Sequence, residues 1–129
     1  MIVLDTCAVV WMLGDSSLLS SSARGAIEES GVVGGVFISG ITLYELAWLI
    51  KNNRLASDIS LDAFFKEVES KCLVLPISSA IARLAVELPN SYPKDPMDRI
   101  IGATALDRGI PLVTRDRGIR NSKAVPVIW

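Results

Sequence analysis

The chain has 129 residues, of which 50% are apolar and 21% charged, and its formal net charge is −1. This length and apolar content suit a domain with a buried core and exclude a disordered chain. No apolar run approaches the roughly 20 residues that cross a bilayer. The first residues also lack the basic flank and cleavage site of a secretory signal, so we expect a cytoplasmic protein without membrane contact.

The sequence contains no histidine. This excludes Ser-His-Asp and Cys-His catalysis, histidine acid–base chemistry and any histidine-ligated metal site. The two cysteines, Cys7 and Cys72, match no zinc-binding spacing and lie in apolar surroundings, so we expect both to be buried free thiols. Catalysis would have to use carboxylates, hydroxyls, lysine, arginine or a bound ion.

Short apolar runs alternate with segments of helical periodicity. The expected strands are Ile2–Leu4, Val36–Ser39, Leu73–Leu75, Leu112–Thr114 and Val125–Ile128. The expected helices include Ala23–Glu29, Leu43–Lys51, Leu61–Ser70 and Ile81–Leu88, with Ser60 and either Ser78 or Ser79 as N-caps. The alternation predicts one α/β domain over residues 1–129, with a central, mainly parallel sheet of four to five strands.

The segment Leu43–Lys51 is apolar on more than one helical face, which is wider than a single core stripe. Either both sides are buried within the domain or one side meets a partner. Trp11 and Met12, just after the first strand, raise the same question. We therefore expect a homodimer, the commonest assembly of soluble proteins.

Basic residues gather toward the end of the chain. Residues 94–129 hold 7 basic and 4 acidic side chains, whereas residues 1–93 hold 6 basic and 10 acidic ones. A local basic region can attract a polyanion, although a solvated surface explains the same charges.

Four acidic residues stand at the edges of expected elements. Asp5 follows the first strand and Asp116 follows the strand Leu112–Thr114, so both lie at the carboxyl edge where α/β sheets bind ligands. Asp5 is equally well explained as a helix N-cap, and Asp116 as a turn residue before Arg117 and Gly118.

The other two acids lie at helix starts. Thr42-Leu43-Tyr44-Glu45 fits a capping box, in which Glu45 bonds back to the cap residue. Asp95-Pro96-Met97-Asp98 is a compact helix start, with Asp95 as cap and Asp98 one turn later. Their placement at one sheet edge with Asp5 and Asp116 predicts mutual repulsion, which a hard cation such as Mg²⁺ or Mn²⁺ would relieve.

These segments together resemble the PIN domain, specifically the VapC toxins of toxin–antitoxin pairs. The matching pieces are Asp5-Thr6, Thr42-x-x-Glu45-Leu46, Asp95-Pro96-x-Asp98-Arg99 and Leu112-Val113-Thr114-Arg115-Asp116, and the resemblance covers essentially the whole chain. It implies a three-layer α/β/α fold and a metal-dependent ribonuclease, usually homodimeric, that a small antitoxin holds inactive. Many relatives carry a histidine shortly before the Asp-Pro stretch, where this chain has Tyr92-Pro93-Lys94, so substrate contacts are expected to differ.

The resemblance also implies roles for individual residues. Asp5, Asp98 and Asp116 would hold one or two Mg²⁺ or Mn²⁺ ions, with Glu45 as a further ligand or as the base that orients water. Asp95, Thr6, Arg99 and Thr114 would support these acids, and Arg99, Arg115 or Arg117 would contact RNA phosphates.

Two alternative functions have to be compared with this prediction. A phosphatase of the haloacid dehalogenase type needs a second aspartate two residues after the first, and that position is Cys7. A non-catalytic PIN-fold interaction or RNA-binding module is the remaining alternative, and metal-dependent RNA cleavage would decide against it.

Overall fold

The computed structural model describes residues 1–56 and 58–129. The strands in this part of the chain are β1 (Ile2–Leu4), β2 (Val36–Ser39), β3 (Leu73–Leu75), β4 (Leu112–Val113) and β5 (Val127–Ile128). The helices are α1 (Thr6–Leu13), α2 (Ser21–Val32), α3 (Gly40–Lys51), α4 (Leu61–Lys71), α5 (Ser79–Glu87), α6 (Pro96–Arg108) and α7 (Arg117–Ser122), with a 3-10 helix, η1 (Ser16–Leu18). Within the described residues, every helix is too short or too polar to cross a lipid bilayer.

The strands form one parallel sheet in the order β3-β2-β1-β4-β5. The chain leaves β1 toward β2 on one side and reaches β4 on the other, so β1 and β4 meet where the strand order reverses. Ligands bind in such sheets outside the carboxyl ends of the strands at this switch point. The predicted parallel sheet of four to five strands is confirmed, and the fold places Asp5 directly at that point.

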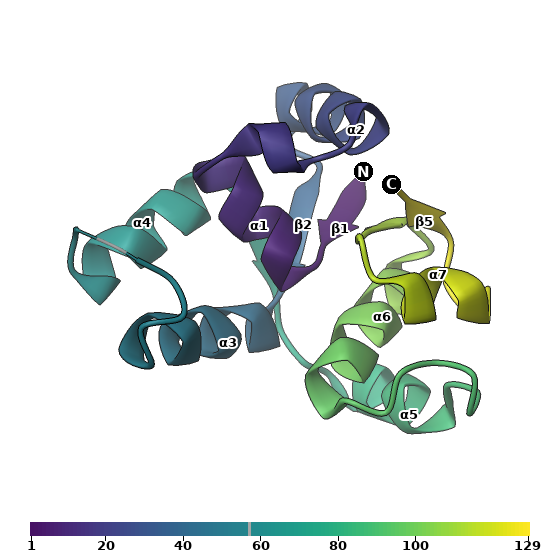
Figure 1. The fold of residues 1–129 in the computed structure, drawn as a ribbon. Coiled ribbons are helices and arrows are strands. Elements are labelled where there is room, and N and C mark those ends of the chain that lie inside the picture. Colours follow the sequence, from purple (N-terminus) through teal and green to yellow (C-terminus); the bar gives the residue numbers. More distant parts are fainter. Residues whose placement is uncertain (57) are drawn as a thin grey trace.

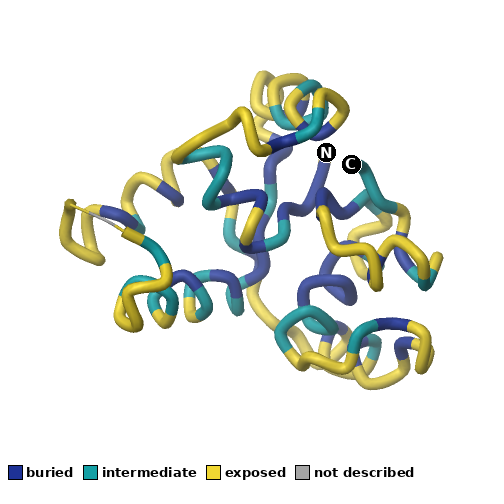
Figure 2. The backbone as a smooth tube through the Cα atoms, in the orientation of Figure 1, coloured by how far each residue is buried: buried dark blue, intermediate teal, exposed yellow. Residues whose placement is uncertain are grey.

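Helices lie on both faces of the sheet (Figure 1), and the side chains of the short strands alternate between these two layers. Ile2 and Leu4 pack on one face in a cluster that includes residues of α1, α2 and α4. Val3, between them, packs on the other face with Ile101 and Ala105 of α6. Because side chains of a strand alternate between faces, three residues of β1 are enough to join both layers. The central strands β1 and β4 are buried throughout and β2 nearly so, whereas the edge strands β3 and β5 are more exposed (Figure 2). The expected α/β/α arrangement is confirmed.

Side-chain caps define most helix starts, as predicted for Ser60 and Ser78. Ser60 accepts a hydrogen bond from the Ala63 amide at 3.2 Å, and Ser78 accepts one from the Ile81 amide at the same distance. Each cap satisfies an amide that the helix itself leaves unpaired.

The predicted capping box at Thr42 is wrong. Helix α3 begins at Gly40 and is capped by Ser39, whose hydroxyl accepts from the Ile41 amide at 3.2 Å. Strand β2 therefore runs directly into the helix, and Thr42 lies inside its first turn. The Thr42 hydroxyl is buried without a hydrogen-bond partner, so Glu45 is not held by a cap.

Four smaller differences concern the ends of two strands, one short helix and one thiol. Strand β4 ends at Val113, one residue earlier than predicted, and β5 begins at Val127. The turn expected after Asp116 is the short helix α7, which Asp116 caps. Cys72 is buried as predicted, but Cys7 is exposed, because its position on α1 turns it toward the carboxyl edge of the sheet rather than into the core.

Candidate active site

A pocket of about 550 Å³ opens at the carboxyl edge of β1 and β4. Its lining brings together three of the four predicted acids, a set of arginines and two indoles: Asp5, Cys7, Trp11, Asp98, Arg115, Asp116, Arg117, Arg120 and Trp129. The acids come from the ends of different elements, so only the folded chain assembles this pocket.

Asp5 links the first strand to the first helix. Its backbone amide donates to the Val113 carbonyl at 3.1 Å, which ties it to β4, and its Oδ1 accepts from the Ala8 amide at 2.8 Å, which caps α1. Burial raises the pKa of the Asp5 carboxyl to about 6, against lowering by hydrogen bonds from Thr114 and Ala8, with further raising by the charges of Glu45 and Asp116. The N-cap and the site position of Asp5 are thus compatible.

Asp98 lies in the first turn of α6. Burial, together with the charges of Asp95, Asp116, Glu45 and Asp5, raises the pKa of Asp98 to about 7. Four neighbouring carboxylates therefore act on one group, although their elements are distant in sequence. This electrostatic crowding is the direct sign that the fold gathers the predicted acids.

Asp116 is exposed at the mouth of the pocket. Its Oδ1 accepts from the Ile119 amide at 2.8 Å and caps α7, while its own amide donates to the Thr114 hydroxyl at 3.1 Å. Thr114 is fully buried and also reaches the Asp5 carboxyl. The Thr114 hydroxyl therefore bridges two of the acids, which supports the predicted role of Thr114.

Glu45 reaches the site from α3. Its Oε1 accepts a hydrogen bond from the hydroxyl of Thr6, the first residue of α1. Thr6 is buried, so this contact fixes the Glu45 carboxylate beside Asp5 without a helix cap. The predicted supporting role of Thr6 thus has a concrete hydrogen bond.

Asp95 and Arg99 organise the segment that carries Asp98. Asp95 caps α6, accepting from the Met97 amide at 2.8 Å, and Pro96 occupies the first helical position. The Arg99 guanidinium donates to the carbonyls of Ala85, Leu88, Tyr92 and Pro93. These bonds commit Arg99 to holding the segment before α6, so it is not available for the phosphate contact suggested for it.

Tyr92 completes this support. It is 1% exposed, its hydroxyl donates to the Asp98 carbonyl at 2.9 Å, and the Arg99 guanidinium lies 5.9 Å from its ring centroid. A Cβ at Gly102 would collide with the Tyr92 hydroxyl, so α6 needs glycine there to let the phenol reach Asp98. In the sequence, Tyr92 stands out only as part of the Tyr92-Pro93-Lys94 stretch, where many relatives carry a histidine.

The carboxylate oxygens of this pocket are the ligands that a hard cation prefers, but they do not form a complete metal site by themselves. In the described residues, 1–56 and 58–129, no group of three or more acidic, cysteine or histidine side chains is close enough to hold a metal ion. Three acids make other hydrogen bonds, with Asp5 and Asp116 capping helices and Glu45 bound to Thr6. Mg²⁺ commonly binds through one or two carboxylates and several waters, and the residues present fit that mode.

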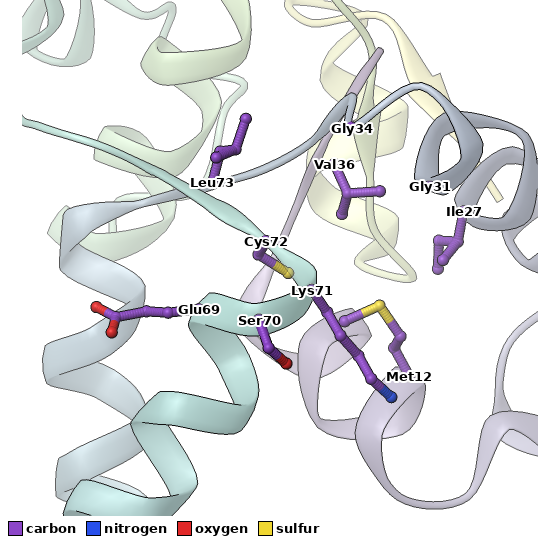
Figure 3. Close-up of a pocket in the computed structure, with 10 residues that line it drawn as sticks. All are labelled: Met12, Ile27, Gly31, Gly34, Val36, Glu69, Ser70, Lys71, Cys72 and Leu73. Atoms are coloured by element: carbon purple, nitrogen blue, oxygen red, sulfur yellow. The ribbon is translucent and has the colours of Figure 1, made fainter.

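A second pocket, of about 470 Å³, lies at the opposite end of the sheet, beside the amino ends of β2 and β3 (Figure 3). Met12, Val36 and Cys72 give it an apolar wall. Glu69 points away from Lys71 in this view, so charged groups do not converge there. The chemistry of the molecule is concentrated at the carboxyl edge.

Comparison with known proteins agrees with this geometry. The family model described as PIN domain matches residues 2–124. The chain is 33% identical over 122 residues to "Ribonuclease VapC22" of Mycobacterium tuberculosis, covering 95% of this chain and 92% of that protein.

Solved structures share the fold at lower identity. A chain of the crystal structure of VapBC2 from Rickettsia felis, bound to a DNA fragment from its promoter, has a TM-score of 0.74 at 18% identity over 98% of this chain and 97% of that one. A chain of a toxin–antitoxin complex from Klebsiella pneumoniae has a TM-score of 0.72 at 22% identity, over 100% of this chain and 97% of that one. The chain belongs to the PIN domain family, and within it to the group of the VapC ribonucleases.

Proposed function

We propose that this protein is a VapC-type ribonuclease toxin that hydrolyses RNA phosphodiester bonds with Mg²⁺ or Mn²⁺ at the carboxyl-edge pocket. The observation that carries this proposal is the gathering of Asp5, Asp98 and Asp116 in one pocket at the carboxyl edge of the sheet, where neighbouring carboxylates add to the raised pKa of Asp98. The 33% identity to a ribonuclease over nearly the whole chain supports the nuclease activity.

In this proposal Asp5, Asp98 and Asp116 hold one or two ions, with Glu45 as a further ligand or as the group that orients water. A bound ion of this kind lowers the pKa of water and offsets charge on the phosphate. Thr6 holds the Glu45 carboxylate and Thr114 holds Asp5. Because the pKa values of Asp5 and Asp98 are about 6 and about 7, cation binding near neutral pH releases protons from them.

The chain's arginines would bind the substrate backbone. Arg115 and Arg117 are exposed at the mouth of the pocket, where they can neutralise phosphates on either side of the scissile bond without reading sequence. Arg99 supports this only indirectly, by fixing the segment before α6.

We also propose two protein partners, an antitoxin and a second copy of this chain. The structural relatives include VapBC complexes, so we propose a small antitoxin that covers the pocket. We also propose a homodimer, for which Tyr44 and Trp48 of α3, 60% and 45% exposed, are candidate contacts. Residues 1–129 would act as a single PIN domain in the cytoplasm.

The test is cleavage of a structured RNA with Mn²⁺ or Mg²⁺, with and without a chelator. We expect Asp5→Asn to abolish cleavage while the fold persists, because asparagine caps a helix as well as aspartate does. Asp15→Asn is the matched control, since Asp15 also caps a helical turn but lies outside the pocket. Full activity of Asp5→Asn, or chelator-resistant cleavage, would refute the assignment.

A non-catalytic interaction module is the second candidate. The observation in its favour is that, in the described part of the chain, no three metal-binding side chains converge. Calorimetric titration with Mn²⁺ separates the two candidates. An absence of binding together with an absence of cleavage would support the interaction module.

A further inference from the structure

One wall of the active-site pocket is aromatic and comes from opposite ends of the chain. Trp11 of α1 and Trp129, directly after β5, have ring centroids 5.7 Å apart at an interplanar angle of 52°. The Arg115 guanidinium lies over the Trp11 ring, 5.8 Å from its centroid. All three residues line the same pocket as Asp5 and Asp98.

Core packing accounts for only part of this arrangement. Both indoles pack against the main core cluster, yet each is only half-buried and also lines the pocket. Trp48 of α3 offers an internal comparison. Arg54 lies over its ring at 6.0 Å, but Trp48 does not line the carboxylate pocket. The same pair of residue types thus occurs once at the site and once away from it.

The arginines beside the aromatic wall form no ion pair within the described residues. In the part of the chain that the structure describes, the one ion pair joins Arg83 to Glu87 on α5. Arg115, Arg117 and Arg120 are exposed around the pocket and therefore keep their charges for a ligand. An aromatic platform beside unpaired arginines is the combination that binds single-stranded nucleic acid, because bases stack and phosphates pair with the cations.

We propose that Trp11 and Trp129 form a stacking subsite for an unpaired nucleobase next to the scissile phosphate, with Arg115 held over Trp11 to contact the adjoining phosphate. This inference rests on the proposed function and narrows its substrate class. A base inside a duplex cannot offer its face to an indole, so the subsite selects single-stranded or looped RNA. It gives little preference among the four bases, since each has a π-face.

Binding can be tested apart from cleavage. A labelled single-stranded oligoribonucleotide is titrated by fluorescence polarisation in EDTA, at low salt, against the wild-type protein and single variants. We expect Trp11→Leu and Trp129→Leu to weaken binding about 5- to 150-fold, the range for loss of one stacked base. Phe65→Leu is the matched control, because Phe65 is also an aromatic side chain packed half-buried against the main core cluster but lies outside the pocket. It should bind within about twofold of the wild type, and Trp11→Phe should retain most of the affinity.

A second measurement does not depend on the leucine variants folding. In a Trp48→Phe protein, Trp11 and Trp129 are the two remaining tryptophans, and under selective tryptophan excitation a stacked base should quench their emission as the oligoribonucleotide binds. A blunt duplex of the same sequence should quench far less. Unchanged affinity of folded Trp11→Leu and Trp129→Leu proteins, or no quenching at saturation, would overturn the proposal and favour a protein segment as the occupant of this wall.

Cleavage with Mn²⁺ is measured in parallel, so that the two proposals fail separately. Quenching without any cleavage would refute the ribonuclease assignment and leave the stacking subsite standing. Cleavage with an unchanged KM in the Trp11→Leu and Trp129→Leu proteins would refute the subsite and leave the ribonuclease.

Discussion

Replacing Asp5 by asparagine should make the metal-free protein more stable at pH 8. Burial and neighbouring acids raise the Asp5 pKa from 3.8 to about 6, so the folded state favours the protonated form. The contribution of Asp5 to the free energy of unfolding is therefore fully present below pH 3.8 and is lost as the pH rises through 6. At about 1.36 kcal/mol per pKa unit, the ionised carboxylate costs about 3 kcal/mol at pH 8.

Asparagine removes the charge and keeps the Ala8 cap, so Asp5→Asn should recover between about 1 and 3 kcal/mol at pH 8. For a chain of this size each kcal/mol raises Tm by about 4 °C. At pH 4 the penalty in the wild type falls below about 1 kcal/mol, because Asp5 is then mostly protonated in the folded state. The assay is urea unfolding in EDTA at pH 4, 6 and 8, followed by circular dichroism.

Addition of Mg²⁺ should reverse the order of the two proteins. A ligand at 1,000 times its Kd stabilises the folded state by about 4.1 kcal/mol, which exceeds the gain expected for Asp5→Asn, and only the wild type keeps the Asp5 ligand. Asp15→Asn should show neither effect, since Asp15 is exposed and its pKa is lowered by hydrogen bonds from Ser17. If Asp5→Asn is no more stable than the wild type at pH 8, or is stabilised equally at pH 4 and 8, the reasoning about buried charge fails.

Three further changes test other parts of the site. Mg²⁺ affinity, measured by calorimetry, should rise about tenfold between pH 6 and 7, with proton release, because ionisation of Asp98, with a pKa of about 7, contributes about fivefold and that of Asp5, with a pKa of about 6, about twofold; a pH-independent affinity would contradict this. Gly102→Ala should cost about 1 to 3 kcal/mol in urea unfolding by driving a methyl group into the Tyr92 hydroxyl, and Tyr92→Phe in the same chain should restore part of the loss. Arg99→Lys should cost about 2 kcal/mol or more, since an ammonium cannot span the carbonyls that the guanidinium bonds; Arg83→Lys, on the surface of α5, should be neutral.

The sheet and its site edge could be predicted because they depend on local signals. Apolar runs of three or four residues, such as Ile2–Leu4 and Val36–Ser39, mark buried parallel strands with correct bounds. An acid that follows such a strand, as Asp5 does, must then lie at the carboxyl edge. These steps need only the period of the strands and the parallel topology that alternating helices impose.

The errors come from competition that sequence spacing does not reveal. Thr42 and Glu45 have the spacing of a capping box, but Ser39 ends β2 and caps the helix first. Asp116-Arg117-Gly118 has the composition of a turn, yet it starts the six-residue helix α7. Cys7 lies in an apolar run, but a helical run has a face that turns away from the core.

Contacts between residues far apart in the sequence cannot be predicted from local sequence patterns. The pairing of Trp11 with Trp129 joins the first helix to the end of the last strand, and only the order β3-β2-β1-β4-β5 brings β5 to that side of β1. Arg99 reads in sequence as a free cation, and its bonds to four carbonyls depend on the path of the segment before α6. Tertiary structure decides both.

The capping roles and the proposed metal role of the acids have one physical origin. In a parallel α/β sheet every strand feeds a helix at the same edge, so acids that cap those helices gather there, as Asp5 and Asp116 do. Helix N-termini offset some of the negative charge, yet the pKa values of Asp5 and Asp98 remain raised because burial dominates. The fold therefore keeps an unrelieved electrostatic cost at its switch point. A bound cation would remove that cost, and the reversal of stability between wild type and Asp5→Asn on adding Mg²⁺ measures whether it does.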